Sequence, residues 1–187
     1  MLGIVSAIFF VVTLSHSFFE DAGTLRSIQN IKGDITMMNQ TDSLPFNLSK
    51  DDLASVDILY AYYSAKTGAG KQEIIITGNG IVKLFLTRSM YDDAPKIKEG
   101  KLTSENIILL LDIMEGENFF GLEDFYPPAD DPHSRRVLRL SLPDRTKTVV
   151  LEGSCVPEFE RIAGAVKFAV GTALPDAINY RFFPNLF

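Results

Sequence analysis

The chain has 187 residues, of which 46% are hydrophobic and 22% are charged, and its formal net charge at pH 7 is −6. This length and composition fit one globular domain with a core of its own. Acidic residues are spread along the chain and no basic stripe or Lys/Arg cluster occurs, which argues against an electrostatic grip on nucleic acid or anionic lipid. We therefore expect no nucleic-acid partner.

The N-terminal stretch from Leu2 to Phe19 differs from the rest of the chain. It is almost wholly apolar up to Leu14, and Ser15 and Ser17 offer the small residues that precede a signal-peptidase site. We interpret residues 1–17 as a secretory signal peptide, which predicts a secreted or periplasmic protein. The alternative is an uncleaved membrane anchor formed by this same stretch, although it is shorter than the ~20 residues of a usual spanning helix.

Residues 18–50 show no sustained hydrophobic period and contain many Gly, Asn, Ser and Thr residues. We expect them to form a loosely ordered leader to a single domain over residues 51–187. Asn39-Gln-Thr41 and Asn47-Leu-Ser49 match the glycosylation sequon, which would have no meaning in a prokaryote. One cysteine, Cys155, is present, so no internal disulfide is expected.

The first part of the predicted domain has the pattern of a strand followed by a hairpin. Residues 56–65 alternate and are rich in aromatic and β-branched side chains, which is typical of a strand. Glu73–Thr77 and Ile81–Thr87 flank Gly78-Asn79-Gly80, and because Gly and Asn tolerate positive φ this segment predicts a β-hairpin. Met90 to Gly100, rich in Asp, Lys and Pro, is expected to be a surface loop.

A helix is predicted after this loop, with a start signal at Thr103, whose hydroxyl can cap the first free N–H groups. One apolar stripe follows at helical spacing, formed by Ile107, Leu110, Leu111 and Met114. We expect Gly116 to end the helix with a positive φ. The aromatic segment from Phe119 to Tyr126 is expected to seal the helix against the edge of a sheet.

A second hairpin and a second helix complete the predicted elements. Val137–Leu142 and Lys147–Leu151 are the expected strands, joined by a turn at Pro143. Pro157 fits the first position of a helix with an apolar stripe from Phe159 to Val170. Strands that come in hairpins need not run parallel. The order therefore predicts an α+β fold, with an antiparallel sheet of about five strands and two helices packed on one face.

Four short motifs follow one another along the chain: Gly78-Asn-Gly-Ile-Val, Leu102-Thr-Ser-Glu, Asn118-Phe-Phe-Gly-Leu-Glu-Asp-Phe-Tyr and Pro157-Glu-Phe. Together they resemble a family of small exported bacterial domains of unknown function, over roughly Val56 to Val170. The resemblance implies an exported domain of this fold and no established activity. Some family members have a Cys-x-Gly-x-Cys element before the hairpin. Thr67-Gly-Ala-Gly-Lys stands there in this chain, so no redox or metal role is carried over.

Acidic residues around three prolines form the best candidate site in the sequence. Asp124, Asp130, Asp131 and His133 lie close together in the chain and offer ligands for calcium or another divalent metal. Their spacing matches no known metal loop, and a solvated loop is the alternative. Cys155 precedes the second predicted helix, where the helix dipole can lower a thiol pKa, and with His133 it would form a nucleophilic pair. A small cysteine buried in the core is the alternative there.

The sequence contains no catalytic set, no cofactor loop and no basic patch. This favours a non-catalytic exported domain that binds a protein or peptide at the cell envelope and needs no cofactor. Its binding surface would be an exposed sheet edge or, if it faces solvent, the end of the apolar tail from Phe182 to Phe187. The alternative is a metal- or thiol-dependent hydrolase that uses the acidic turn or Cys155. A tethering protein is a third hypothesis, favoured if the N-terminal segment stays attached.

Overall fold

The structure describes residues 44–64, 70–87, 94–128 and 134–177, and in this part of the chain seven strands form one sheet. In the computed structural model the strands are β1 (Asp57–Ser64), β2 (Lys71–Thr77), β3 (Ile81–Thr87), β4 (Lys96–Lys101), β5 (Phe125–Tyr126), β6 (Ser134–Ser141) and β7 (Thr146–Glu152). The helices are α2 (Lys50–Leu53), α3 (Ser104–Gly116) and α4 (Pro157–Ala173). Short 3-10 turns are η2 (Pro45–Asn47), η3 (Phe119–Gly121) and η4 (Pro175–Ala177).

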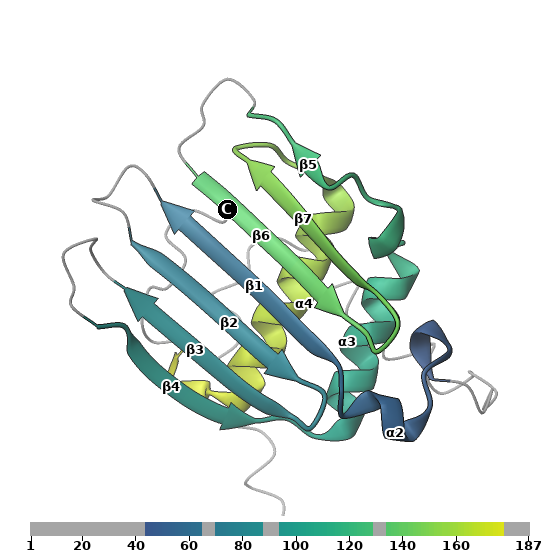
Figure 1. Ribbon diagram of the computed structural model, residues 1–187. Helices are drawn as coiled ribbons and strands as arrows, with labels where there is room; N and C mark the ends of the chain where they lie inside the picture. The colour runs from purple at the N-terminus through teal and green to yellow at the C-terminus, as the bar shows by residue number, and fades with distance from the viewer. Residues whose placement is uncertain (1–43, 65–69, 88–93, 129–133, 178–187) are drawn as a thin grey trace, which may run out of the picture. The chain divides into compact units, whose positions relative to one another are not determined.

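The sheet has the order β4-β3-β2-β1-β6-β7-β5 and is antiparallel except at one edge (Figure 1). β1 lies in the middle, where it pairs with β2 on one side and with β6 on the other. β5 is two residues long and runs parallel to β7. The predicted class, an α+β fold with an antiparallel sheet, is confirmed. The expected number of about five strands is wrong, because the structure adds β4 and β5.

β4 occupies much of the segment that we expected to be a surface loop. It has the sequence Lys-Ile-Lys-Glu-Gly-Lys, in which Ile97 is the one large apolar residue, so no alternating pattern indicated a strand. The strand continues into Leu102, whose N–H donates to the carbonyl of Gly80 at 2.8 Å and joins the end of β4 to the start of β3. An edge strand has one neighbour, and it therefore tolerates charged side chains on both faces.

On each long strand one alternating set of side chains is buried. Ile58 and Tyr60 of β1 and Leu138 and Leu140 of β6 belong to this set, and each is at most 1% exposed. They form one core with the apolar stripes of α3 and α4. α3 and α4 contact each other, and in Figure 1 their ribbons pass behind those of the strands.

α3 begins where the sequence predicted. The Thr103 hydroxyl accepts a hydrogen bond from the N–H of Asn106 at 3.4 Å, and the predicted apolar stripe is buried. Gly116 is the last residue of the helix, but its φ is not positive, so this prediction is wrong. The left-handed residue is Asn118, with φ 51°, because asparagine also tolerates this conformation and the chain turns there.

The turn between β2 and β3 confirms the predicted hairpin. Gly80 has φ 88°, and a Cβ at this position would lie 2.3 Å from the carbonyl oxygen of Leu102. A Cβ at Gly78 would lie 1.6 Å from the carbonyl oxygen of Leu53. The two glycines are therefore needed because α2 and the end of β4 both pack closely against this turn.

Packing against the core begins earlier in the chain than residue 51. Leu48 is buried, and Leu44 and Phe46 pack against the core. The N–H of Phe46 donates to the carboxylate of Glu115 at 2.9 Å, and its ring meets that of Phe120 edge to face. The predicted signal peptide and residues 18–43 lie outside the described residues. Among the described helices, none has the length and apolar character needed to cross a membrane.

The two glycines Gly164 and Gly100 are expected to respond oppositely to substitution by alanine. At Gly164, within α4, a Cβ would meet nothing within 4 Å outside the backbone of its own helix. Gly164→Ala should therefore raise the free energy of unfolding by about 1 kcal/mol, because alanine loses less conformational entropy in a helix. Gly100→Ala should lower it, because the Cβ would lie 2.4 Å from the carbonyl oxygen of Ala173. Urea unfolding measures both, and effects of the same sign would contradict this packing.

Candidate functional site

Of the four residues predicted to bind a metal, the structure describes Asp124. Its side chain is 81% exposed and its carboxylate pairs with the ammonium group of Lys147. Asp130, Asp131 and His133 lie outside the described residues. Within the described ranges, no three His, Cys, Asp or Glu side chains are grouped so that they could hold a metal ion. The metal site therefore stays a prediction.

Cys155 lies between β7 and α4 and is exposed, so the alternative that it packs in the core is wrong. The residue before it is held in place on both sides. The Ser154 hydroxyl donates to the carbonyl of Pro127 at 2.7 Å, and the Ser154 carbonyl accepts from Arg136 at 2.7 Å. His133 lies outside the described residues, so the nucleophilic pair of Cys155 and His133 stays a prediction.

β4 forms an open edge of the described sheet. It pairs with β3 on one side, and no other described strand pairs with its second side. In an antiparallel ladder, alternate residues direct their N–H and C=O groups to opposite sides. Because the N–H of Leu102 points to Gly80, the backbone groups of Ile97, Glu99 and Lys101 are directed to the open side. This edge therefore offers backbone donors and acceptors to a further strand.

The side chains of β4 are mostly cationic, because its six residues include Lys96, Lys98 and Lys101. The carboxylate of Glu99 lies 3.2 Å from the ammonium group of Lys83 on β3. Ile97 is 54% exposed and pairs across the ladder with Phe85. Charged side chains protect an edge against pairing with another sheet, whereas an exposed β-branched residue favours such pairing. The edge combines both properties.

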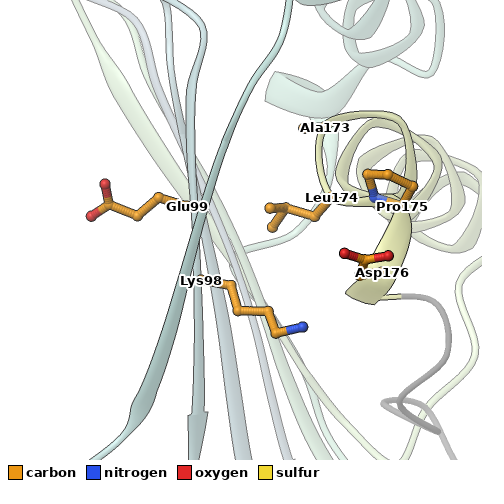
Figure 2. Close-up of a pocket in the computed structure, with 6 residues that line it drawn as sticks. All are labelled: Lys98, Glu99, Ala173, Leu174, Pro175 and Asp176. Carbon is orange, nitrogen blue, oxygen red and sulfur yellow. The ribbon is translucent and has the colours of Figure 1, made fainter.

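A pocket of about 340 Å³ lies between β4 and the end of α4. Its lining residues come from β4, from the end of α4, from η4 and from the residue between these two: Lys98, Glu99, Ala173, Leu174, Pro175 and Asp176. Figure 2 shows the side chain of Leu174 pointing toward β4, with Lys98 and Asp176 on the same side of the strand and Glu99 on the other. A cavity of about 150 Å³ already holds a benzene ring. This pocket therefore has room for a large apolar side chain.

The electrostatic potential differs between the two sides of this pocket. The N–H of Leu174 donates to the carbonyl of Val170 at 2.8 Å and ends α4, and no basic residue lies in the last turn of the helix. The carbonyl end of a helix carries a partial negative charge. This end and the carboxylate of Asp176 make the α4 side negative, whereas the lysines make the β4 side positive.

A second group of polar side chains lies between β1, β6 and α4. Arg136 is 7% exposed and donates to the carboxylate of Glu160 at 2.6 Å, and its guanidinium lies 5.5 Å from the centre of the Phe159 ring. Tyr60 packs near the same ring, and burial raises the pKa of its hydroxyl. This hydroxyl has no hydrogen-bond partner among the described residues. Arg136 also donates to the carbonyl of Ser154. Through Arg136, β6 is therefore linked both to the segment between β7 and α4 and to Glu160 on α4, which is the role of a structural ion pair.

Replacing Lys167 by methionine is expected to stabilise the protein at neutral pH. The Lys167 ammonium lies 5.8 Å from the centre of the Tyr60 ring, and burial lowers the Lys167 pKa to about 8, although the Glu160 carboxylate opposes this shift. Below this pH the folded protein holds a partly buried cation. Lys167→Met should therefore raise the free energy of unfolding at pH 7 by about 1–2 kcal/mol.

The difference in free energy of unfolding between Lys167→Met and the wild type should shrink as the pH rises. The Lys167 pKa is near 10.5 in the unfolded chain and about 8 in the folded one, so between these values the unfolded chain binds more protons and the wild type gains stability with pH. Urea unfolding between about pH 7 and pH 10 measures the difference. Lys83→Met, at a more exposed lysine, is the control. A difference between Lys167→Met and wild type that does not change with pH would contradict the explanation by a buried cation.

Sequence reasoning named an exposed sheet edge as a binding surface without locating it, and it missed Arg136. The composition of β4 gave no signal for a strand. The sequence did contain a signal for Arg136, because this residue lies two residues before Leu138 and therefore shares the inward face with Leu138 and Leu140. An arginine on a buried face needs a charged or polar partner, and Glu160 is that partner.

The fold and the edge together define the chain as an α+β domain with a mainly antiparallel sheet, in which β4 is an edge strand among the described residues. Comparisons with models of known protein families and with curated protein sequences found no match. Its function is therefore argued from the geometry of its own residues.

Proposed function

We propose that this chain is a non-catalytic domain of the cell envelope that binds an extended segment of another protein as an added strand beside β4. The observation that carries the proposal is the open edge of β4 next to the pocket at Leu174. In strand addition, backbone hydrogen bonds provide affinity, and pockets for alternate side chains provide specificity. The edge of β4 offers backbone groups that do not pair with β3, and one pocket lies beside it.

The position of α4 supports this choice of edge. On this proposal α3 and α4 close one face of the sheet, and the end of α4 forms the second wall of a groove along β4. The close approach of Gly100 to Ala173 brings helix and strand together there. The opposite edge of the sheet is less suitable, because β5 pairs with part of β7 and is itself only two residues long.

The cellular location is part of the proposal. The apolar stretch from Leu2 to Phe19 and the resemblance to exported bacterial domains favour a secreted or periplasmic protein, or one that is anchored through this stretch. If residues 1–17 are cleaved, N-terminal sequencing of the protein from its native envelope should give Phe18 as the first residue. Met1 as the first residue would favour the anchor.

The variant Glu99→Pro tests the edge directly. Proline removes the outward N–H of residue 99 and blocks an added strand, but it leaves the hydrogen bonds between β4 and β3 in place. Glu99→Ala is the matched control, because it removes the same carboxylate and the same contact with Lys83 while it keeps the N–H. Circular dichroism shows whether each variant is folded.

Phage-displayed random peptides selected on the full chain provide the ligands for this test. We expect the enriched peptides to bind the wild type and Glu99→Ala with similar Kd values. They should bind Glu99→Pro about tenfold more weakly, because the hydrogen bond from the N–H of residue 99 is lost. If no peptide is enriched, or if Glu99→Pro binds as well as the wild type, the proposal is wrong. The lysines of β4 would then act only to keep the edge from pairing.

A further inference from the structure

We infer that the segment added beside β4 carries an acidic residue next to Lys96 and, two positions away, an apolar residue in the pocket at Leu174. This inference rests on the proposed function and adds the chemistry of the partner. It follows from the alternation of side chains along β4 and from the unequal charges of the groove.

The register of β4 determines which partner side chains share a face. Lys96 and Lys98 pair with Leu86 and Leu84 of β3, and these two leucines are buried in the core. Partner side chains opposite Lys96 and Lys98 therefore point to the face of the sheet on which the pocket lies. They are two residues apart whether the added segment runs parallel or antiparallel to β4.

The partner side chain opposite Lys98 enters the pocket. Leu174 provides an apolar wall, and the aliphatic part of Lys98 can lie along an apolar side chain. The Asp176 carboxylate and the carbonyl end of α4 repel an acidic side chain at this position. A leucine or isoleucine is therefore favoured here.

The partner side chain opposite Lys96 is acidic. Lys96 is exposed and does not line the pocket, so it lies outside the negative end of the groove. A carboxylate on the neighbouring strand would form a cross-strand ion pair with it. Between these two positions, the partner residue opposite Ile97 points to the other face, where an apolar side chain would cover Ile97 and Phe85.

The charge of β4 argues against a second copy of this chain as the occupant. In the antiparallel registers centred on Ile97 or Lys98, two β4 strands paired edge to edge would bring lysines of both copies together, and like charges on neighbouring strands are destabilising. A partner with a carboxylate next to Lys96 replaces this repulsion by attraction. The structure therefore favours a different protein segment over self-association.

Three matched peptides test this chemistry. The first has the sequence Ser-Thr-Glu-Val-Leu-Val-Glu-Thr-Ser, which places a glutamate two positions from the leucine in either strand direction. The second has lysine in place of both glutamates, and the third has serine in place of leucine. Fluorescence anisotropy of each labelled peptide with the full chain gives its Kd. We expect the lysine peptide to bind roughly two- to fivefold more weakly than the first, as for an exposed ion pair. The serine peptide should bind roughly tenfold more weakly or worse, because a leucine is no longer buried.

Two variants of the protein assign these effects to residues. Lys96→Glu should reverse the preference between the glutamate and lysine peptides. Leu174→Ala should remove most of the difference between the leucine and serine peptides. If neither variant changes the respective preference, the inferred register and chemistry are wrong, even where the peptides bind.

The outcomes distinguish this inference from the proposed function. If the glutamate and lysine peptides bind equally and Glu99→Pro weakens both, strand addition is correct and the acidic preference is wrong. If Glu99→Pro binds all peptides as the wild type does, the proposed function itself is wrong. If the full chain self-associates and Glu99→Pro does not, the occupant is a second copy, and the inference is overturned.

Discussion

Replacing Phe159 by alanine is expected to lower the free energy of unfolding by about 3–5 kcal/mol, the largest effect among the substitutions considered for this chain. Phe159 is fully buried, and the centre of its ring lies 6.4 Å from that of Tyr60. Truncation to alanine leaves a cavity between α4 and the sheet. It also removes the ring that lies against the guanidinium of Arg136.

Phe168 provides a matched control on the same helix. Its side chain is 60% exposed, so Phe168→Ala should change the free energy of unfolding by no more than about 0.5 kcal/mol. Urea unfolding followed by far-UV circular dichroism measures both variants. Equal losses in the two would mean that α4 does not bury the face that the structure assigns to it.

Replacing Arg136 by methionine is expected to lower the free energy of unfolding by about 2–3 kcal/mol. The substitution leaves the Glu160 carboxylate without its partner and the Ser154 carbonyl without its donor. The side chain of Glu160 is 30% exposed, so water reduces the cost below that of a fully buried charge. Methionine keeps most of the apolar contact with Phe159, and the loss therefore reports mainly on the ion pair.

Arg161 forms an ion pair at the surface, and Arg161→Met serves as the comparison for Arg136→Met. It donates two hydrogen bonds of 2.6 Å to Glu117, but its side chain is 52% exposed, so Arg161→Met should change stability by less than about 1 kcal/mol. The double variant of Arg136→Met with Glu160→Met should recover part of the loss, because the unpaired carboxylate is then absent. A double variant less stable than Arg136→Met alone would show that the carboxylate has other favourable contacts.

Structure was predictable from the sequence where a segment carries its own signal. Gly78-Asn79-Gly80 predicted a hairpin because few other residues tolerate its backbone, and Thr103 and Pro157 indicated where α3 and α4 begin. The exception is the end of α3. There Gly116 was expected to take the left-handed conformation, but it is still helical, and Asn118, which also tolerates this conformation, takes it two residues later.

The order of the strands carries no such local signal. β4 is a strand because it lies next to β3, and its lysines are tolerated because no other described strand pairs with it. The candidate site depends on this order, since the edge strand and the end of α4 are far apart in sequence and meet at Gly100 and Ala173. The sequence could therefore suggest that a sheet edge is the binding surface, but it could not show that Lys96–Lys101 forms this edge.

The central place of β1 affects how the protein can be made. β1 emerges first from the ribosome, and β2 follows directly to pair with one of its sides, but its other side pairs with β6, which is synthesised much later. Until Ser134 has been added, one side of β1 has no partner strand, and α4, which supplies part of the core together with α3, has not yet been made. Long-range pairing of this kind folds slowly. The nascent chain should therefore stay incompletely folded until β6, β7 and α4 have been made.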